Sequence, residues 1–245
     1  MIIIPAIDLK GGRCVRLRQG NMDSATVFGE HPAEQALEWQ RRGASRIHVV
    51  DLEGSVGGRP ANFDSVKEIV DAVRVPIQVG GGIRDERTIR LYLDAGVTNV
   101  ILGTIAAKDP EHVLHLLSLF PRAVSIGIDA RSGVVAVEGW TESAKITALD
   151  LAAHFASEHV ASFIYTDIER DGMMLGPNIP ATREFARNTS RPVILSGGIS
   201  SLEDVRRALP LGQEGVTGII IGRALYEGAI QLEDAIQLAE TQNAR

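Results

Sequence analysis

The sequence contains little cysteine and no surplus of basic charge. Cys14 is the single cysteine among 245 residues, which excludes an internal disulfide and a zinc cage built from cysteines. We interpret Cys14 as structural and expect a reducing, cytoplasmic location. Acidic residues (31) outnumber basic residues (25), giving a formal net charge of −6. Wholesale binding to nucleic acid or adhesion to anionic membranes is therefore disfavoured, and we expect neither as a partner.

Long apolar runs are also missing. No run approaches the roughly 20 residues that a bilayer span requires. The apolar run at residues 1–7 has no basic segment before it and is interrupted by Pro5 and Asp8, so it does not predict a signal peptide. No group of His, Cys or carboxylate residues has the spacing of a zinc or calcium site, so we expect no metal. Hydrophobic residues make up 44% and charged residues 23%, which predicts a soluble globular protein with a substantial core.

Short β-branched runs alternate along the chain with longer segments of helical periodicity, the pattern of parallel βα units. Eight strands are predicted, at residues 2–8, 46–51, 76–79, 99–102, 124–129, 162–167, 192–196 and 218–221. The helices that follow them are expected near residues 31–42, 62–73, 85–95, 110–119, 147–158, 180–188, 201–209 and 228–240.

The second half of the chain repeats the first. Four strand-end signatures recur in the same order, 116 to 121 residues later: Asp8 as Asp129, Asp51 as Asp167, the GGI at 81–83 as that at 197–199, and Gly103 as Gly222. Four βα units cannot close a barrel, but two sets of four can, so we predict one α/β domain over residues 1–245, a (βα)8 TIM barrel of two (βα)4 half-barrel repeats, about 1–120 and 121–245. An open doubly wound sheet is the rival, yet no G-x-G-x-x-G follows the first strand.

Polar residues gather where the predicted strands end, which is where (βα)8 barrels carry their chemistry. Asp8 and Asp129 end the first and fifth strands, so their carboxylates are expected to face each other across the barrel mouth. Such a pair suits a base and an acid acting on two ends of one substrate. An aspartate at a strand end also commonly caps a helix or forms a turn. The recurrence of four such aspartates favours function.

Glycine turns end four of the strands and offer backbone N–H groups at close approach, an arrangement that holds phosphate. The alternative is that each glycine merely permits a tight turn. Their repeat register predicts two phosphate cups about opposite each other, hence a bisphosphate ligand. The first cup comprises Gly81, Gly82, Gly103 and Thr104, and the second Gly197, Gly198, Gly222 and Arg223.

Four further residues are candidates for substrate contact. Trp140 lies in the long segment after the fifth strand, where its ring is suited to stack on a planar group. His48 lies within the second strand and either reaches the mouth or is packed as a satisfied core histidine. Arg16 and Arg84 are suited to steer phosphates, although solvated arginines are common.

Several ordered segments resemble the phosphoribosylformimino-5-aminoimidazole carboxamide ribotide isomerases of histidine biosynthesis. They are PAIDLKGGRCVRLRQG (5–20), VGGGIR (79–84), YTDIERDGMMLGPN (165–178), SGGIS and IIGRAL, and the similarity runs from residue 2 to about residue 230. The resemblance implies a (βα)8 barrel that opens the ribose ring of an aminoaldose and converts it to the aminoketose. This Amadori rearrangement needs no cofactor, and its small-molecule ribotide substrate carries a phosphate at each end. The resemblance also favours a monomer.

The resemblance assigns roles to individual residues. Asp8 matches the acceptor of the ribose C2′ proton, and Asp129 matches the residue usually assigned as the acid that protonates the ring oxygen. Asp171 matches another aspartate proposed as that acid, so both assignments stay open, and Thr166 matches an active-site threonine. Trp140 matches a tryptophan that stacks on the aminoimidazole. Arg16 and Arg84 match arginines near the substrate.

Other functions are weighed against this one. The cyclase subunit of imidazole glycerol phosphate synthase has C-L-D-V in its first motif, where this chain has A-I-D-L. A dual-substrate isomerase that also accepts phosphoribosylanthranilate carries an extra arginine ahead of the loop tryptophan. Here Glu138 stands there, and if it faced the site it would repel the anthranilate carboxylate, so we interpret the enzyme as specialised for the histidine-pathway ribotide. A non-catalytic phosphosugar-binding barrel is the remaining alternative, because a fold alone proves no chemistry.

Overall fold

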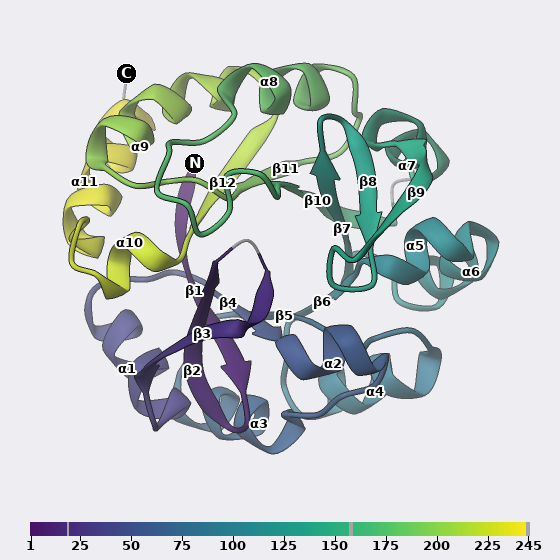
Figure 1. Ribbon diagram of the computed structural model, residues 1–245, viewed down its shortest axis with the longest axis horizontal. Helices are drawn as coiled ribbons and strands as arrows, with labels where there is room; N and C mark the ends of the chain where they lie inside the picture. The colour runs from purple at the N-terminus through teal and green to yellow at the C-terminus, as the bar shows by residue number, and fades with distance from the viewer. Residues whose placement is uncertain (19, 157–158, 244–245) are drawn as a thin grey trace.

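A closed ring of eight parallel strands forms the centre of the molecule. The computed structural model describes residues 1–18, 20–156 and 159–243. The strands pair in the order β10, β11, β12, β1, β4, β5, β6 and β7, and β10 also pairs with β7, which closes the ring (Figure 1). Their bounds are β1 (Ile2–Lys10), β4 (Ile47–Asp51), β5 (Ile77–Gly80), β6 (Asn99–Leu102), β7 (Val124–Arg131), β10 (Val160–Asp167), β11 (Val193–Ser196) and β12 (Val216–Ile221). The predicted (βα)8 barrel is thus confirmed.

A helix follows each barrel strand and covers the outside of the ring (Figure 1). These helices are α1 (Pro32–Arg41), α3 (Phe63–Ala72), α4 (Glu86–Asp94), α6 (Pro110–Leu119), α7 (Ala148–His154), α8 (Ile179–Arg187), α9 (Leu202–Ala208) and α11 (Leu232–Asn243). All eight overlap their predicted ranges. The helix expected over 147–158 ends at His154, and residues 157–158 lie outside the described residues.

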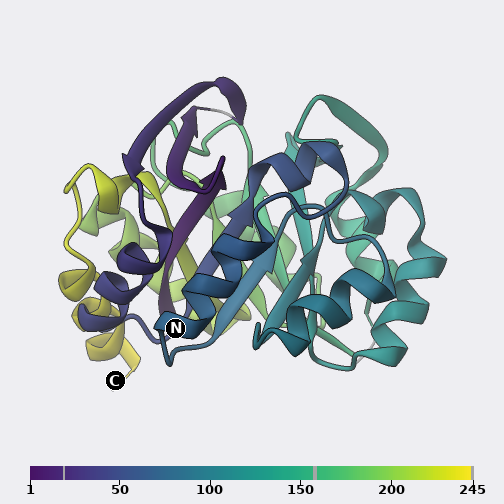
Figure 2. The same cartoon turned by 90° about the horizontal axis from the view of Figure 1, so that it is seen from below.

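Two antiparallel extensions at the carboxyl ends of the barrel strands were not predicted. β1 continues into β2 (Arg13–Arg18) and β3 (Asn21–Gly29), and β7 into β8 (Val134–Val137) and β9 (Glu142–Thr147). Figure 2 shows both extensions at one end of the barrel, with the chain termini at the other. The first hairpin turn of each extension has positive φ at both central residues, 56° and 74° at Gly11 and Gly12, and 49° and 81° at Ser132 and Gly133. Such turns match the twist of the strands they join, so the Gly-Gly pair was a usable hairpin signal.

Four further short helical turns lie in the described part of the chain. α2 (Leu52–Gly57), α5 (Thr104–Lys108) and α10 (Arg223–Tyr226) each follow directly on a barrel strand or one residue after it, and the 3₁₀ turn η1 (Leu209–Glu214) follows α9. The first three therefore border the barrel mouth, where they set the backbone around the cavity.

Alternation along the strands divides the buried residues between two layers. Outward residues such as Ile47, Val49 and Ile126 join the helices in the larger core. Inward residues form a smaller aliphatic cluster inside the ring: Ile4, Ala6, Ile101, Ile164, Ile194 and Ile220. Because successive side chains on a strand point to opposite faces, the inward set continues upward to Asp8 and Asp129. The parity of each residue thus decides whether it can reach the mouth.

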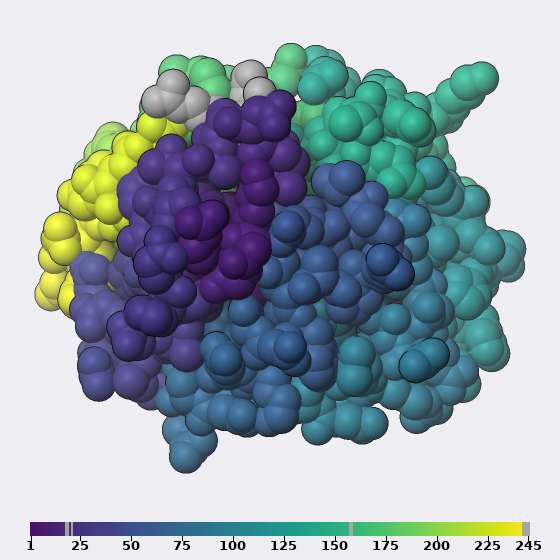
Figure 3. Space-filling model, turned by 60° about the horizontal axis from the view of Figure 1, so that its bottom comes forward, coloured from purple at the N-terminus to yellow at the C-terminus, as the bar shows by residue number. Residues whose placement is uncertain are grey.

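The first and last βα units lie side by side in the barrel. Ile2 to Pro5 of β1 pair in parallel with residues of β12, and Arg42, just after α1, forms an ion pair of 2.7 Å with Glu233 of α11. Figure 3 shows the yellow C-terminal region lying against the purple N-terminal region on this face. In the described part of the chain, no helix is long and apolar enough to cross a membrane.

Candidate active site

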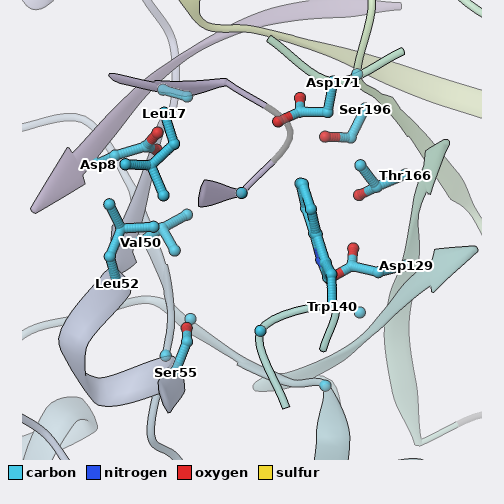
Figure 4. Close-up of a pocket in the computed structure, with 18 of the residues that line it drawn as sticks. Asp8, Leu17, Val50, Leu52, Ser55, Asp129, Trp140, Thr166, Asp171 and Ser196 are labelled. Atoms are coloured by element: carbon cyan, nitrogen blue, oxygen red, sulfur yellow. The ribbon is translucent and has the colours of Figure 1, made fainter. Parts of the chain in front are cut away.

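A cavity of about 250 Å³ opens at the carboxyl ends of the barrel strands, and every predicted site residue lines it. The four expected catalytic residues, the four expected substrate contacts and the eight residues of the two glycine cups all belong to its wall. Figure 4 shows Asp8 and Asp129 on opposite sides of this cavity, with Asp171 and Thr166 along its rim. The repeated strand-end aspartates Asp8 and Asp129 thus face each other across the cavity.

Asp8 forms a buried ion pair with Arg16. Asp8 lies near the end of β1 and Arg16 lies on β2, and their Oδ2 and Nη1 atoms are 2.7 Å apart. Burial raises the pKa of Asp8, and the charge of Arg16 and its hydrogen bond oppose that rise. The guanidinium of Arg16 also donates to the carbonyl of Ala6 and lies 4.9 Å from the ring centre of Tyr226. Arg16 is therefore held against Asp8, where it favours the carboxylate form.

Asp129 accepts a hydrogen bond from the indole of Trp140. It lies near the end of β7, and its Oδ2 is 2.7 Å from the indole Nε1. Thr166 of β10 is its neighbour across the ladder and also bonds to its carboxylate. Burial raises the pKa of Asp129, and the bonds from Trp140 and Thr166 lower it. Figure 4 shows the indole standing in the cavity beside Asp129.

Asp171 lies on the loop after β10, close to both other carboxyl groups. Burial raises its pKa to about 7; the charges of Asp8 and Asp129 raise it too, while Arg16 lowers it. The loop is held by a bond of 3.1 Å from the Asp171 N–H to the Asp167 carbonyl, and by a bond of 2.7 Å from Arg223 to the Gly172 carbonyl. At neutral pH, Asp171 therefore exists partly as the neutral acid.

The other two strand-end aspartates do not reach the cavity. Asp51 and Asp167 are on outward positions of their strands, and neither lines the cavity wall. Asp167 accepts bonds from Glu169 N–H (3.0 Å) and Asn178 Nδ2 (2.6 Å). The interpretation of all four matched aspartates as functional is thus wrong for this pair. The period-2 alternation of the strands separates them from Asp8 and Asp129.

Asp51 anchors the segment after β4 through four hydrogen bonds. Its carboxylate accepts from Gly54 N–H, Ala61 N–H, Asn62 N–H and the Asn62 amide, at 2.7 to 2.8 Å. Replacing Asp51 with alanine would leave these buried donors unpaired, so we expect a loss of about 3 kcal/mol in the free energy of unfolding. Chemical denaturation measures this, with Asp71→Ala on exposed helix surface as the matched control, expected within about 0.5 kcal/mol of wild type. An Asp51→Ala variant as stable as that control would contradict the anchoring role.

The glycine turns after β5 and β11 pack closely against the backbone at the ends of β4 and β10. Gly81 and Gly197 have φ of 108° and 88°. A Cβ on Gly81 would collide with the backbone carbonyl of Asp51, and one on Gly197 would lie 3.1 Å from that of Asp167. The alternative explanation, that a tight turn requires glycine, therefore holds at both positions. It coexists with a place on the cavity wall, because both turns line it.

The segment that carries Trp140 is fixed by Glu138. Positive φ values at Glu138, Gly139 and Trp140 (53°, 61° and 72°) wind it into a tight turn. The Glu138 carboxylate pairs with Arg84 at 3.2 Å and with Lys108, and its N–H donates to Thr104 Oγ1 at 3.0 Å. Glu138 does not line the cavity. Glu138 therefore does not face the site, and the predicted repulsion of an anthranilate carboxylate does not apply.

Two contacts over the cavity were missed in the sequence. The tip of the β2–β3 hairpin lies over Trp140, where a Cβ on Gly20 would overlap the indole ring. Ser55 and Val56 of α2 also line the wall. Neither carries a chemical signature, so no sequence pattern indicated them. Among the described residues, no group of three or more His, Cys, Asp and Glu residues is arranged to hold a metal ion.

The fold and the site define a (βα)8-barrel protein with opposed carboxylates and two glycine cups at its mouth. The family follows from the sequence comparisons: residues 2–231 match the family model described as histidine biosynthesis protein, and the chain belongs to that family. A protein of Syntrophus aciditrophicus (strain SB) is 54% identical over 98% of this chain and all of its own. One of Geobacter sulfurreducens (strain ATCC 51573 / DSM 12127 / PCA) is 52% identical over 98% of both chains. Both are named 1-(5-phosphoribosyl)-5-((5-phosphoribosylamino)methylideneamino) imidazole-4-carboxamide isomerase.

Proposed function

We propose that this protein is an isomerase of L-histidine biosynthesis. It converts the aminoaldose N′-formimino-5-aminoimidazole carboxamide ribotide to the aminoketose by an Amadori rearrangement. The observation that carries the proposal is the cavity with Asp8 and Asp129 on opposite sides, between two glycine cups. The family and the names of the relatives support it, because such a substrate has two phosphoribosyl ends and reacts between them.

Asp8 acts as the general base. The reaction requires removal of the C2′ proton after the ribose ring has opened, and a carboxylate serves only while ionised. The Arg16 guanidinium at 2.7 Å supports ionised Asp8 despite burial. Removal of this proton leaves an enaminol, which becomes the C2′ ketone when a proton returns at C1′ and the C2′ hydroxyl loses its own.

Asp171 donates the proton to the ring oxygen. Cleavage of the C1′–O4′ bond needs an acid that is still protonated near neutral pH, and Asp171 has a pKa raised to about 7. Asp129 is less suited, because its Oδ2 accepts the indole N–H, an interaction that favours the ionised form. Asp8, which is paired with Arg16, thus acts as the base, and the nearby Asp171 acts as the acid.

The two cups hold the phosphate ends of the substrate. Gly81, Gly82, Gly103 and Thr104 form one cup and Gly197, Gly198, Gly222 and Arg223 the other, with Arg84 beside the first. Backbone N–H groups at such turns bind phosphate without a lysine. Between the cups, Trp140 stacks on the aminoimidazole, and His48 and Thr166 contact the ribosyl groups.

The remaining properties follow from the same reaction. Ring opening and proton transfer change no oxidation state overall, so the chemistry needs no redox cofactor. Asp8 and Asp171 supply the base and the acid, so we propose neither a cofactor nor a metal. The partner is a small bisphosphorylated ribotide; nucleic acid and membranes are not partners. We propose a monomer of one domain, in the cytoplasm, where the single thiol of Cys14 stays reduced.

A turnover assay of the purified protein with the aminoaldose ribotide, without added cofactor, tests the function. We expect turnover of this ribotide and none of phosphoribosylanthranilate run beside it. The expectation that only the ribotide reacts rests on the ion pair between Glu138 and Arg84. An arginine already paired with a carboxylate is less able to bind the carboxylate of an anthranilate. Turnover of both compounds would refute the specialisation. Turnover of neither would refute the function and favour a binding protein or the cyclase.

A further inference from the structure

His48 faces the cavity from β4, one level below Asp8 in the ring. Its Cα lies opposite Ala6 of β1 and Gln78 of β5, whereas Asp8 lies opposite Val50. The imidazole is buried, with 8% of the residue exposed, and it still lines the cavity. Its Nδ1 atom lies 3.0 Å from Nε2 of Gln78. One ring nitrogen is thus occupied by the neighbouring strand, and Nε2 remains for the cavity.

Gln78 reaches the cavity only through His48. It is 1% exposed and does not belong to the cavity wall. The amide nitrogen of glutamine has two N–H groups and no lone pair for a hydrogen bond, so it donates and Nδ1 of His48 accepts. Burial and the charge of Arg16 lower the pKa of His48 to about 3, so the imidazole is neutral. A neutral imidazole whose Nδ1 accepts carries its single proton on Nε2.

We propose that Gln78 is a positioning residue that holds His48 as the Nε2–H tautomer, so that His48 presents an uncharged hydrogen-bond donor to a ribosyl hydroxyl oxygen of the substrate. The identity of this ligand rests on the proposed function, whereas the tautomer does not. A buried partner that fixes the tautomer of a functional histidine is a common device, best known from histidines that bind metals.

An uncharged donor suits a neighbour of Asp8. An imidazolium at this level would stabilise the Asp8 carboxylate further and make it a weaker base. The opposite tautomer would present a lone pair to the cavity and could only accept from a hydroxyl, which would turn that hydroxyl's proton away from other acceptors. The Nε2–H form instead leaves the hydroxyl proton free, as the step that forms the C2′ ketone requires.

Nitrogen NMR of the protein labelled with ¹⁵N-histidine tests the tautomer directly. His48→Gln identifies the His48 signals by their loss. In the wild type we expect an unprotonated Nδ1 and a protonated Nε2. Gln78→Glu, measured at a pH at which the new carboxyl group is ionised, replaces the donor with a carboxylate of the same shape that only accepts, so Nδ1 should become protonated. We also expect kcat/KM for the ribotide to fall about tenfold or more. Gln78→Met, which keeps the length and offers no donor, should give a mixture of tautomers and a smaller loss.

Ser125→Ala is the matched control. Ser125 is 1% exposed, lies on β7, which pairs with neither β4 nor β5, and bonds Ser162 at 2.8 Å. It should leave the His48 signals and kcat/KM near wild type. A protonated Nδ1 in the wild type, or unchanged signals or unchanged kcat/KM in Gln78→Glu, would overturn the proposal. If wild type shows the expected tautomer but does not turn over the ribotide, the proposed function fails and the assignment of the proton stands.

Discussion

Replacement of Asp8 by asparagine is expected to remove nearly all turnover while the fold and ligand binding remain. Asparagine has the shape of aspartate but cannot take a proton from carbon near neutral pH, and general base catalysis contributes about 10²- to 10⁴-fold to rate. The loss should appear in kcat rather than in the affinity for the ribotide, because the phosphate cups lie on other strands. Steady-state kinetics and a binding titration with the product measure the two effects separately.

The variant also tests the ion pair. Asparagine leaves the Arg16 guanidinium buried without its carboxylate partner, which costs stability. A thermal melt must therefore show that Asp8→Asn is folded at the assay temperature. Asp71→Asn is the control, since it removes the same charge from the exposed surface of α3, and its kinetics should match wild type. Turnover of Asp8→Asn within a few-fold of wild type would exclude Asp8 as the base.

Much of this architecture could be predicted because it depends on local periodicity. The alternation of β-branched runs with amphipathic segments gave eight strands and eight helices, and the internal repeat gave their arrangement in a ring. The positions of Asp8 and Asp129 followed, since strands one and five of an eight-stranded ring lie opposite each other. These inferences require only that the residue at the end of each strand be known.

What could not be predicted depends on contacts between distant segments. The Glu138 carboxylate has partners 54 and 30 residues away, Arg84 and Lys108. Because of these pairs, Glu138 does not face the cavity, which was the condition for its repulsion of an anthranilate carboxylate. The His48–Gln78 pair likewise joins two neighbouring strands 30 residues apart, and no spacing rule for functional sites includes it. Side-chain direction decides these cases, and a single sequence does not encode it in a readable pattern.

Asp51 and Asp167 are an intermediate case, because the necessary information was present. On β4, inward His48 and Val50 fix the parity, so Asp51 must point outward. On β10, inward Ile164 and Thr166 do the same for Asp167. Each of these aspartates holds the segment after its strand by accepting a hydrogen bond from an asparagine eleven residues later. Recurrence in a repeat thus marks structural anchors as readily as catalytic groups.

Replacement of Asp171 by asparagine should remove both the general acid and the alkaline limb of the pH profile. With its pKa raised to about 7, Asp171 is protonated below that pH and active as an acid. As pH rises through 7 it ionises, so kcat/KM of the wild type should fall up to about tenfold for each further pH unit. In Asp171→Asn we expect a loss of about 10²- to 10⁴-fold at pH 6 and no decline with a midpoint near 7.

Asp129→Asn is the decisive comparison, because both carboxyl groups are buried near the reacting ribose. Asparagine there weakens the acceptor for the indole of Trp140, so binding of the ribotide should change, while the alkaline limb near pH 7 should persist. Single-turnover measurements of ring opening separate this step from product release. If the limb disappears in Asp129→Asn and persists in Asp171→Asn, Asp129 is the acid, and its hydrogen bond to Trp140 must break before ring opening. Persistence of the limb in both variants would mean that neither carboxyl group is the sole proton donor to the ring oxygen.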